Sequence, residues 1–229
     1  MASLLLLHAM GSSGRMWRAQ LEAFAGRHEV VAPDLPGHGH AAGPFTMDEA
    51  VAKSRSVLAD LSDPLYVAGV SLGAAVAMRV ALAEPERVAG LLLSGTPLRF
   101  SRVVLAVQRA MTALLPIATT AATSARLTRP ADQRDADALV ADVIAAGKRT
   151  QAQALRELTG QDLTPRLPEI KARTLVCCGG EDRANLASAR LLADRLPNAT
   201  LRLVPGAGHL WNLQRPELCT DMLTELVEG

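Results

Sequence analysis

Aromatic side chains are scarce in this chain of 229 residues, and neither sign of charge dominates it. Phe, Trp and Tyr together make up 3% of the residues, too few for a platform on which single-stranded bases could stack. The 24 basic and 23 acidic residues leave a net charge of +1, so there is no field of one sign to attract a nucleic acid. We therefore expect no nucleic-acid partner.

Cysteines and long hydrophobic runs are also few. The three cysteines are too few for a disulfide framework, and the adjacent Cys177 and Cys178 lie in an apolar run typical of core thiols. We expect a reducing compartment, the cytoplasm. No run of about 18 apolar residues is present, so no membrane span or membrane partner is expected. Leu4–Leu7 has no basic segment before it and no cleavage site after it, which favours a buried strand over a signal peptide.

Predicted strands and helices alternate along most of the chain, which suits one large α/β domain. The strands are continuous apolar runs, the pattern of a parallel sheet covered on both faces. We predict strands at Leu4–Leu7, Glu29–Pro33, Leu65–Ala68, Val88–Ser94, Arg173–Cys178 and Thr200–Val204. We predict helices at Met16–Ala25, Thr46–Leu61, Ala74–Glu84, Leu186–Leu196 and Pro216–Val227. Thr46 and Glu49 fit a capping box at the start of the second of these helices.

The alternation stops between residues 98 and 168, where no convincing strand occurs. Three stretches have helical spacing instead, at Ser101–Leu115, Asp135–Ala146 and Arg149–Leu158. This helical insertion is either a cap over a substrate pocket or a set of extra helices packed on the sheet. Its position after the fourth strand favours the cap. We therefore predict a core of residues 1–97 and 169–229 with a helical cap at 98–168.

The sequence Gly69-Val70-Ser71-Leu72-Gly73 stands between a predicted strand and a predicted helix. A Gly-x-Ser-x-Gly pattern in that setting is typical of a sharp turn that exposes a nucleophilic serine above the sheet. The glycines remove side chains that would collide in such a turn. A plain strand-to-helix turn is the alternative, since the pattern also arises by chance. The flanking elements favour Ser71 as a nucleophile.

A serine hydroxyl needs a base to take its proton and an acid to orient that base. Of the five histidines, only His209 follows a late strand in a glycine-rich loop, although a lone loop histidine is more often a surface residue. The acid would come from Glu181 or Asp182, in the loop after Cys178. Ser94-Gly95-Thr96-Pro97, after the fourth strand, contains no carboxylate.

The oxyanion of a tetrahedral intermediate requires two N–H donors. The amide of Leu72, directly after the nucleophile, is one candidate. The amide of Met10, in the loop after the first strand, is the other, and the Met10 side chain would then line an acyl pocket.

Together these residues resemble the α/β-hydrolase superfamily, in particular its small-lid esterase and lactonase-like members. The resemblance rests on five segments in the family order. They are His8–Gly11, Asp34–Gly39, Gly69–Gly73, Gly179–Asp182 and Gly206–His209. It implies that Asp182, which ends a Gly-x-x-Asp segment, is the acid rather than Glu181. It also implies that His8 shapes its loop, and that the Asp34–Gly39 turn braces the loop that carries Met10.

The chain departs from the family pattern in two places. Ala9 stands where the family usually has a glycine after the histidine. Two N-terminal strands that usually form a hairpin are missing, so we expect a mostly parallel sheet of about six strands. Such a sheet leaves an edge exposed near the N-terminus, and we expect a monomer or a homodimer.

The resemblance implies a serine hydrolase that needs no cofactor or metal. Its small-molecule substrates would be carboxylic esters, thioesters or lactones with an apolar part, cleaved through an acyl-enzyme on Ser71. A carbon–carbon bond hydrolase, a lyase or a perhydrolase with the same triad is the alternative. A non-catalytic small-molecule receptor is a third hypothesis, which an intact triad disfavours. Dehalogenase chemistry is disfavoured because position 71 is serine rather than aspartate.

Overall fold

The computed structural model describes residues 1–96, 98, 102–159 and 162–229. Pro97, Ser101 and Gly160, which mark expected boundaries of the cap and its helices, lie outside the described residues. The strands are β1 (Ser3–Leu7), β2 (Glu29–Val31), β3 (Leu65–Val70), β4 (Val88–Ser94), β5 (Arg173–Gly179) and β6 (Ala199–Val204). They form one parallel sheet in the order β2-β1-β3-β4-β5-β6, which confirms the predicted fold class.

The helices of the described residues fall between these strands and after the last one. They are α1 (Arg18–Phe24), α2 (Met47–Ala59), α3 (Leu72–Ala83), α4 (Arg102–Leu114), α5 (Ile117–Thr128), α6 (Gln133–Thr159), α7 (Leu186–Arg195), α8 (Trp211–Gln214) and α9 (Pro216–Glu228). Two 3-10 helices, η1 (Gly14–Trp17) and η2 (Thr164–Glu169), precede α1 and β5. The predicted helix at Met16–Ala25 is therefore η1 followed by α1.

Alternate residues of the central strands bury their side chains on opposite faces of the sheet, as β1 shows. Leu5 and Leu7 pack in one cluster with residues of α2, α3 and α7. Leu4 and Leu6 pack in the other with residues of α1 and α9. This two-sided burial is why the strands are continuous hydrophobic runs. The edge strand beside β1 is β2, so the N-terminal strand is paired on both sides.

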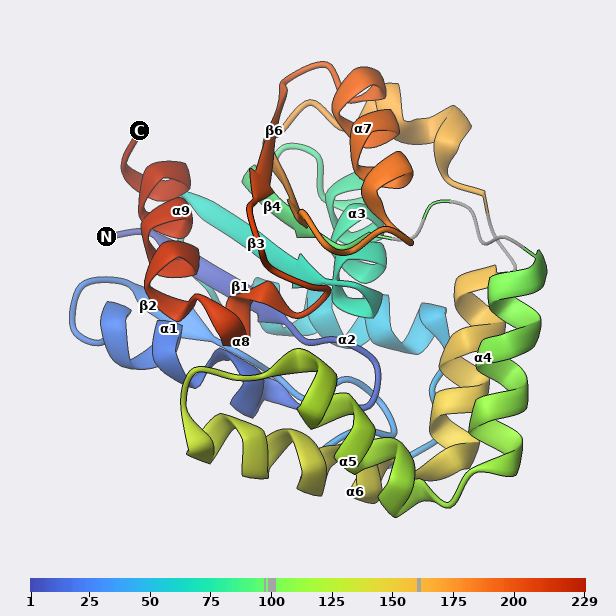
Figure 1. Cartoon of the computed structure of the whole chain (residues 1–229). Helices are drawn as coiled ribbons and strands as arrows, with labels where there is room; N and C mark the ends of the chain where they lie inside the picture. The colour runs from blue at the N-terminus through green and yellow to red at the C-terminus, as the bar shows by residue number, and fades with distance from the viewer. Residues whose placement is uncertain (97, 99–101, 160–161) are drawn as a thin grey trace.

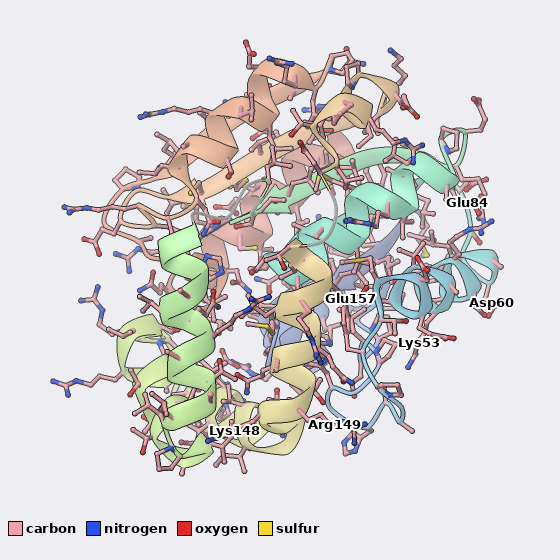
Figure 2. The ribbon with its side chains drawn as sticks, turned by 90° about the vertical axis from the view of Figure 1, so that its right-hand side faces the viewer. Lys53, Asp60, Glu84, Lys148, Arg149 and Glu157 are labelled. Atoms are coloured by element: carbon pink, nitrogen blue, oxygen red, sulfur yellow. The ribbon has the colours of Figure 1, made fainter. Side chains whose placement is uncertain are left out.

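Helices α4, α5 and α6 lie together beside the carboxyl ends of the strands (Figure 1). Gly147 interrupts α6 with φ 67° and ψ 171°, so the predicted break between two helices is present as a kink. Figure 2 shows the half of α6 after this kink beside α4, with Lys148 and Arg149 toward one end and Glu157 toward the other. Helix α5 has no counterpart among the predicted elements.

The inserted helices are also joined to α2. Thr46 accepts a hydrogen bond from the Glu49 amide at 3.2 Å, which is half of the predicted capping box. The neighbouring Met47 amide donates to Glu157 Oε2 of α6 at 3.1 Å. The Glu157 carboxylate therefore caps α2 from outside the helix.

Candidate functional site

Ser71 occupies a sharp turn between β3 and α3. Its φ of 56° and ψ of −109° lie in a region that side chains avoid, so the surrounding structure must impose them. A Cβ on Gly69 would lie 2.4 Å from the carbonyl of Gly73, and one on Gly73 would lie 2.1 Å from the Leu7 oxygen. Both glycines are therefore required by close approach of backbone to backbone. The Ser71 amide donates to the Ser94 carbonyl at 2.8 Å, which ties the turn to the end of β4.

Asp182 and His209, 27 residues apart, meet beyond the ends of β5 and β6. Nδ1 of His209 lies 2.7 Å from Oδ2 of Asp182. Since a carboxylate only accepts hydrogen bonds, the proton sits on Nδ1, and Nε2 carries a lone pair. Nδ2 of Asn185 donates to both carboxylate oxygens at 2.9 Å and lies 3.2 Å from His209 Nδ1. The geometry thus presents His209 Nε2 as an acceptor for a proton.

The Asp182 carboxyl is buried, with 7% of the residue exposed. Burial raises its pKa, but the hydrogen bonds from His209 and Asn185 outweigh burial and leave the pKa below its ordinary value. It is therefore ionised at neutral pH. Glu181 is exposed instead, and its carboxylate lies 3.7 Å from the Arg129 guanidinium. Of the two acids considered from the sequence, only Asp182 contacts His209.

Ser71 and His209 are connected through the turn that follows β4. Ser94 accepts the Ser71 amide, and the next residue, Gly95, touches the His209 ring. The Ser71 side chain has no hydrogen-bonding partner among the described residues, so its hydroxyl is not bonded to the imidazole. Catalytic hydrogen bonds of this kind often tighten only when a substrate is bound.

The loop after β1 is held at both ends. Nε2 of His8 accepts the Leu35 amide at 2.9 Å, and Nδ1 lies 2.8 Å from the Ala9 carbonyl, to which it donates. Burial and, to a smaller extent, the neighbouring His38 lower the pKa of His8 to about 3, so His8 is neutral. At the other end, Asp34 Oδ1 accepts the Gly14 amide at 2.8 Å. His8 and Asp34 therefore fix the loop rather than transfer protons.

Ala9 causes no strain in this loop. The residue with a left-handed backbone is Gly11, with φ 73°, and among the described residues only Ser71 and Arg129 have positive φ without being glycine. The Ala9 amide donates to the thioether of Met16 at 3.4 Å. The family's usual glycine is thus not needed for this backbone conformation.

The amides of Met10 and Leu72 have no acceptor among the residues that the structure describes. Leu72 is the first residue of α3, so its N–H has no partner inside the helix. The start of α3 lies against the end of β1, because a Cβ on Gly73 would stand 2.8 Å from the His8 carbonyl. Two unbonded N–H groups therefore come from neighbouring backbone segments.

Two contributions to this site were not predicted from the sequence. Asn185 is an ordinary polar residue in a loop, with no motif to mark it. Trp211 donates from Nε1 to the Ser94 hydroxyl at 2.6 Å and so supports the end of β4. A tryptophan two residues after His209 is the one signal that could have suggested it.

The described residues hold no group of three or more His, Cys, Asp or Glu side chains that could bind a metal ion. Cys177, Cys178 and Cys219 are free and buried, and burial raises the pKa of both Cys177 and Cys178 to about 12. These thiols are therefore unreactive at neutral pH. Within the same described ranges, no helix is long and apolar enough to cross a membrane.

The site has a strained serine turn directly after a strand, and an acid paired with a histidine on later loops. This arrangement is typical of hydrolases of the α/β class. A model of the alpha/beta hydrolase family matches residues 4–221, and the chain belongs to that family. Its resemblance to this superfamily is confirmed.

Named relatives cover nearly all of the chain. The 3-oxoadipate enol-lactonase 2 of Acinetobacter baylyi is 25% identical over 94% of this chain and 84% of its own length. The pimeloyl-(acyl-carrier protein) methyl ester esterase of Aromatoleum aromaticum is 30% identical over 99% of this chain and 98% of its own. Among solved structures, a hydrolase from Pseudomonas aeruginosa is 25% identical with a TM-score of 0.85, covering 100% of this chain and 90% of that one.

Proposed function

We propose that this α/β hydrolase cleaves carboxylic ester, thioester or lactone bonds of small to medium apolar substrates. Ser71 is the nucleophile, His209 is the base and Asp182 orients it. The observation that carries the proposal is the 2.7 Å contact between His209 and Asp182, with the imidazole against the turn that accepts the Ser71 amide. The names of the esterase and lactonase relatives agree with this substrate class.

The proposed reaction has two steps. Ser71 Oγ attacks the carbonyl carbon while its proton passes to His209 Nε2, and the Met10 and Leu72 amides bind the oxyanion. The intermediate collapses as the alcohol, thiol or lactone oxygen leaves with the proton from His209. Water, activated by the same nitrogen, then releases the acid from Ser71. The ionised Asp182 stabilises the imidazolium that forms in each step.

We place this chemistry in the cytoplasm, where the three buried cysteines would remain reduced. The substrate is a small molecule that needs neither a nucleic acid nor a membrane, and the enzyme works as a monomer or a homodimer. Met10, half-buried against the core, is suited to line the acyl side of the pocket.

Replacing Ser71 with alanine tests the proposal. We expect kcat on p-nitrophenyl butyrate to fall by about 10⁴-fold or more, as when a serine nucleophile is removed from other triads. Ser56→Ala, an exposed serine of α2, is the matched control and should retain full activity. A fluorophosphonate probe should label the peptide that contains Ser71 in the native enzyme and not in Ser71→Ala. Circular dichroism confirms that both variants are folded.

Three results would contradict this assignment in different ways. Activity retained by Ser71→Ala would exclude Ser71 as the nucleophile. Labelling of Ser71 with no turnover of esters, thioesters or lactones, but turnover of a vinylogous diketone or a lyase substrate, would favour carbon–carbon or lyase chemistry. Absence of both labelling and turnover would favour a binding protein.

A further inference from the structure

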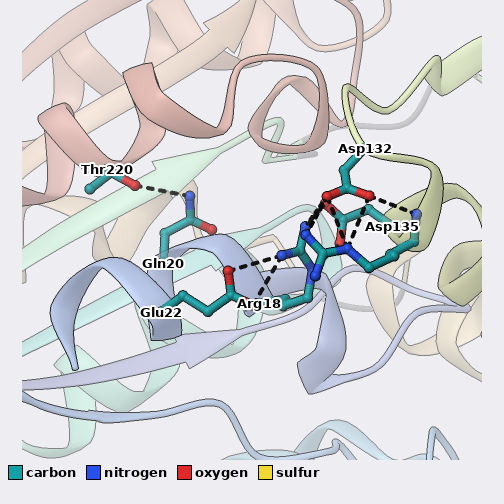
Figure 3. Close-up of polar contacts among 7 residues, drawn as sticks. Arg18, Gln20, Glu22, Asp132, Asp135 and Thr220 are labelled. Carbon is teal, nitrogen blue, oxygen red and sulfur yellow. Dashed lines mark hydrogen bonds and ion pairs between the residues drawn. The ribbon is translucent and has the colours of Figure 1, made fainter.

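The first half of α6 carries two buried carboxylates one heptad apart, Asp135 and Asp142, which bind α1 and the β1 loop respectively. Figure 3 shows the first of these contacts. The Arg18 guanidinium donates from Nε and Nη2 to the two oxygens of Asp135, each at 2.9 Å. Arg18 also pairs with Asp132 and Glu22, which makes a network at the start of α6. This contact joins the cap to α1.

The second contact reaches the loop itself. The Ser13 hydroxyl donates to Asp142 Oδ2 at 2.6 Å, and the Arg15 guanidinium pairs with Oδ1. The same hydroxyl accepts the Arg15 amide at 3.3 Å, so Ser13 caps η1 while it binds the cap. Only 2% of Asp142 is exposed. A buried carboxylate is costly unless it is paired, so this contact is strongly held.

Helix α6 also touches the loop next to Met10. A Cβ on Gly11 would lie 3.6 Å from Val143 and 3.7 Å from Gln151, ordinary van der Waals distances from both halves of α6. His8 and Asp34 fix the ends of the loop from the side of the sheet. The cap thus bounds the part of the loop that follows Met10, from Gly11 to Ser13.

We infer that Asp142 is a positioning residue for the oxyanion site. Through Ser13 it holds the β1 loop so that the Met10 N–H faces the Ser71 hydroxyl, and it thereby links the placement of the cap to oxyanion binding. The inference rests on the proposed function of Ser71 and Met10. Its physical basis is that an oxyanion donor must lie within a few tenths of an ångström of its working position. If Asp142 only attached the cap to the core, replacing Asp142 and replacing Asp135 would have the same effect on activity.

The experiment compares Asp142→Asn with Asp135→Asn. For Asp142→Asn we expect kcat on p-nitrophenyl butyrate to fall about tenfold to a hundredfold, with KM changed little. This fall is smaller than the one that follows complete removal of an oxyanion N–H donor. The inhibition constant of a trifluoromethyl ketone, which forms an oxyanion on the serine, should rise by a similar factor. The pH at which kcat/KM falls on the acid side should not move, because Asp182 and His209 are untouched.

Asp135→Asn changes another buried carboxylate on the same face of α6 and is the matched control. It should lower the melting temperature about as much as Asp142→Asn does, while kcat and the inhibition constant stay near those of the native enzyme. Ser13→Ala removes only the hydroxyl and serves where Asp142→Asn does not fold. We expect it to reproduce the loss of kcat, and the double variant should lose little more than either single one.

Native kcat and inhibitor affinity in folded Asp142→Asn or Ser13→Ala would overturn the inference. Equal losses in Asp135→Asn would also overturn it, because they would show a general effect of the cap. Failure of the proposed function is seen separately, since Ser71→Ala would then keep its activity or the native enzyme would bind no trifluoromethyl ketone.

Discussion

Gly95 lies directly against the imidazole of His209. A Cβ at this position would stand 2.8 Å from Cε1 and 2.9 Å from Nδ1 of the ring, closer than real Cβ contacts allow. Gly95 also has a left-handed backbone, with φ 56°, and its amide donates to the Cys177 carbonyl at 3.2 Å. The turn after β4 therefore forms a wall for the imidazole, and that wall has no room for a side chain.

Gly95→Ala should displace the His209 ring, because the ring is the neighbour that can move. We expect kcat/KM on p-nitrophenyl butyrate to fall by about 10²-fold, as when catalytic groups are misplaced by about 1 Å. Gly26→Ala is the matched control, since Gly26 has φ 74° and nothing within 4 Å of its Cβ position. Both variants should lose about 1 kcal/mol of stability from the backbone alone. Equal activity in the two would show that Gly95 does not confine the ring.

Asn185 should matter for both activity and stability. Its amide binds both oxygens of the buried Asp182 carboxylate, and hydrogen bonds to charged groups contribute about 1.5–3 kcal/mol. Asn185→Ala should lower the free energy of urea unfolding by about that amount and reduce kcat about tenfold, as Asp182 loses a fixed orientation. Asn198→Ala, which removes an exposed amide bonded to the Lys171 carbonyl, should change neither quantity. An Asn185→Ala enzyme with native kcat would limit this residue to a structural role.

The fold could be predicted because its signals are local. Continuous apolar runs predict buried parallel strands, and Gly147 predicts the break in α6 from its own backbone freedom. Helix α5 was missed because Ile117–Thr128 consists mostly of alanine and threonine and has few large apolar side chains to mark a helical face. The motifs predicted Ser71, Asp182 and His209, whose catalytic roles remain predictions although the structure pairs the last two.

The remainder of the site depends on contacts between distant residues that carry no motif. Asp142 and Ser13 are 129 residues apart, and each is a common residue type in a helix or a turn. The choice between Glu181 and Asp182 depended on the family resemblance, because adjacent loop acids differ only in which one turns inward. The backbone conformation of the loop decides which acid turns inward, and no periodic pattern in the sequence indicates that conformation.

Trp211 and Ser94 offer a direct test of the support beneath the nucleophile. Trp211→Phe removes the donor of a 2.6 Å hydrogen bond between two buried groups and leaves the Ser94 hydroxyl unpaired. We expect a loss of about 1–3 kcal/mol in the free energy of unfolding. Adding Ser94→Ala should recover part of that loss, because the unpaired hydroxyl is removed. Strictly additive losses in the double variant would show that the two side chains do not interact.

His8 should make the protein less stable in mild acid. Its pKa is about 3 in the folded protein, chiefly because of burial, whereas an unfolded histidine titrates near 6.5. The unfolded state therefore binds the extra proton between these values. The stability from His8 is fully present above about pH 6.5 and is lost as the pH falls toward 3. Burial also lowers the pKa of His38, which contributes in the same direction.

Urea unfolding of the native protein and of His8→Gln, at intervals from pH 7.5 to 4.5, measures this effect. Glutamine offers both a donor and an acceptor but does not titrate, so His8→Gln should show a shallower decline of unfolding free energy with falling pH. The difference in slope should approach about 1.4 kcal/mol per pH unit, the value for one proton. His40→Gln, at an exposed position, is the matched control and should follow the native curve. Parallel curves for His8→Gln and the native protein would mean that His8 is not the group whose protonation accompanies unfolding.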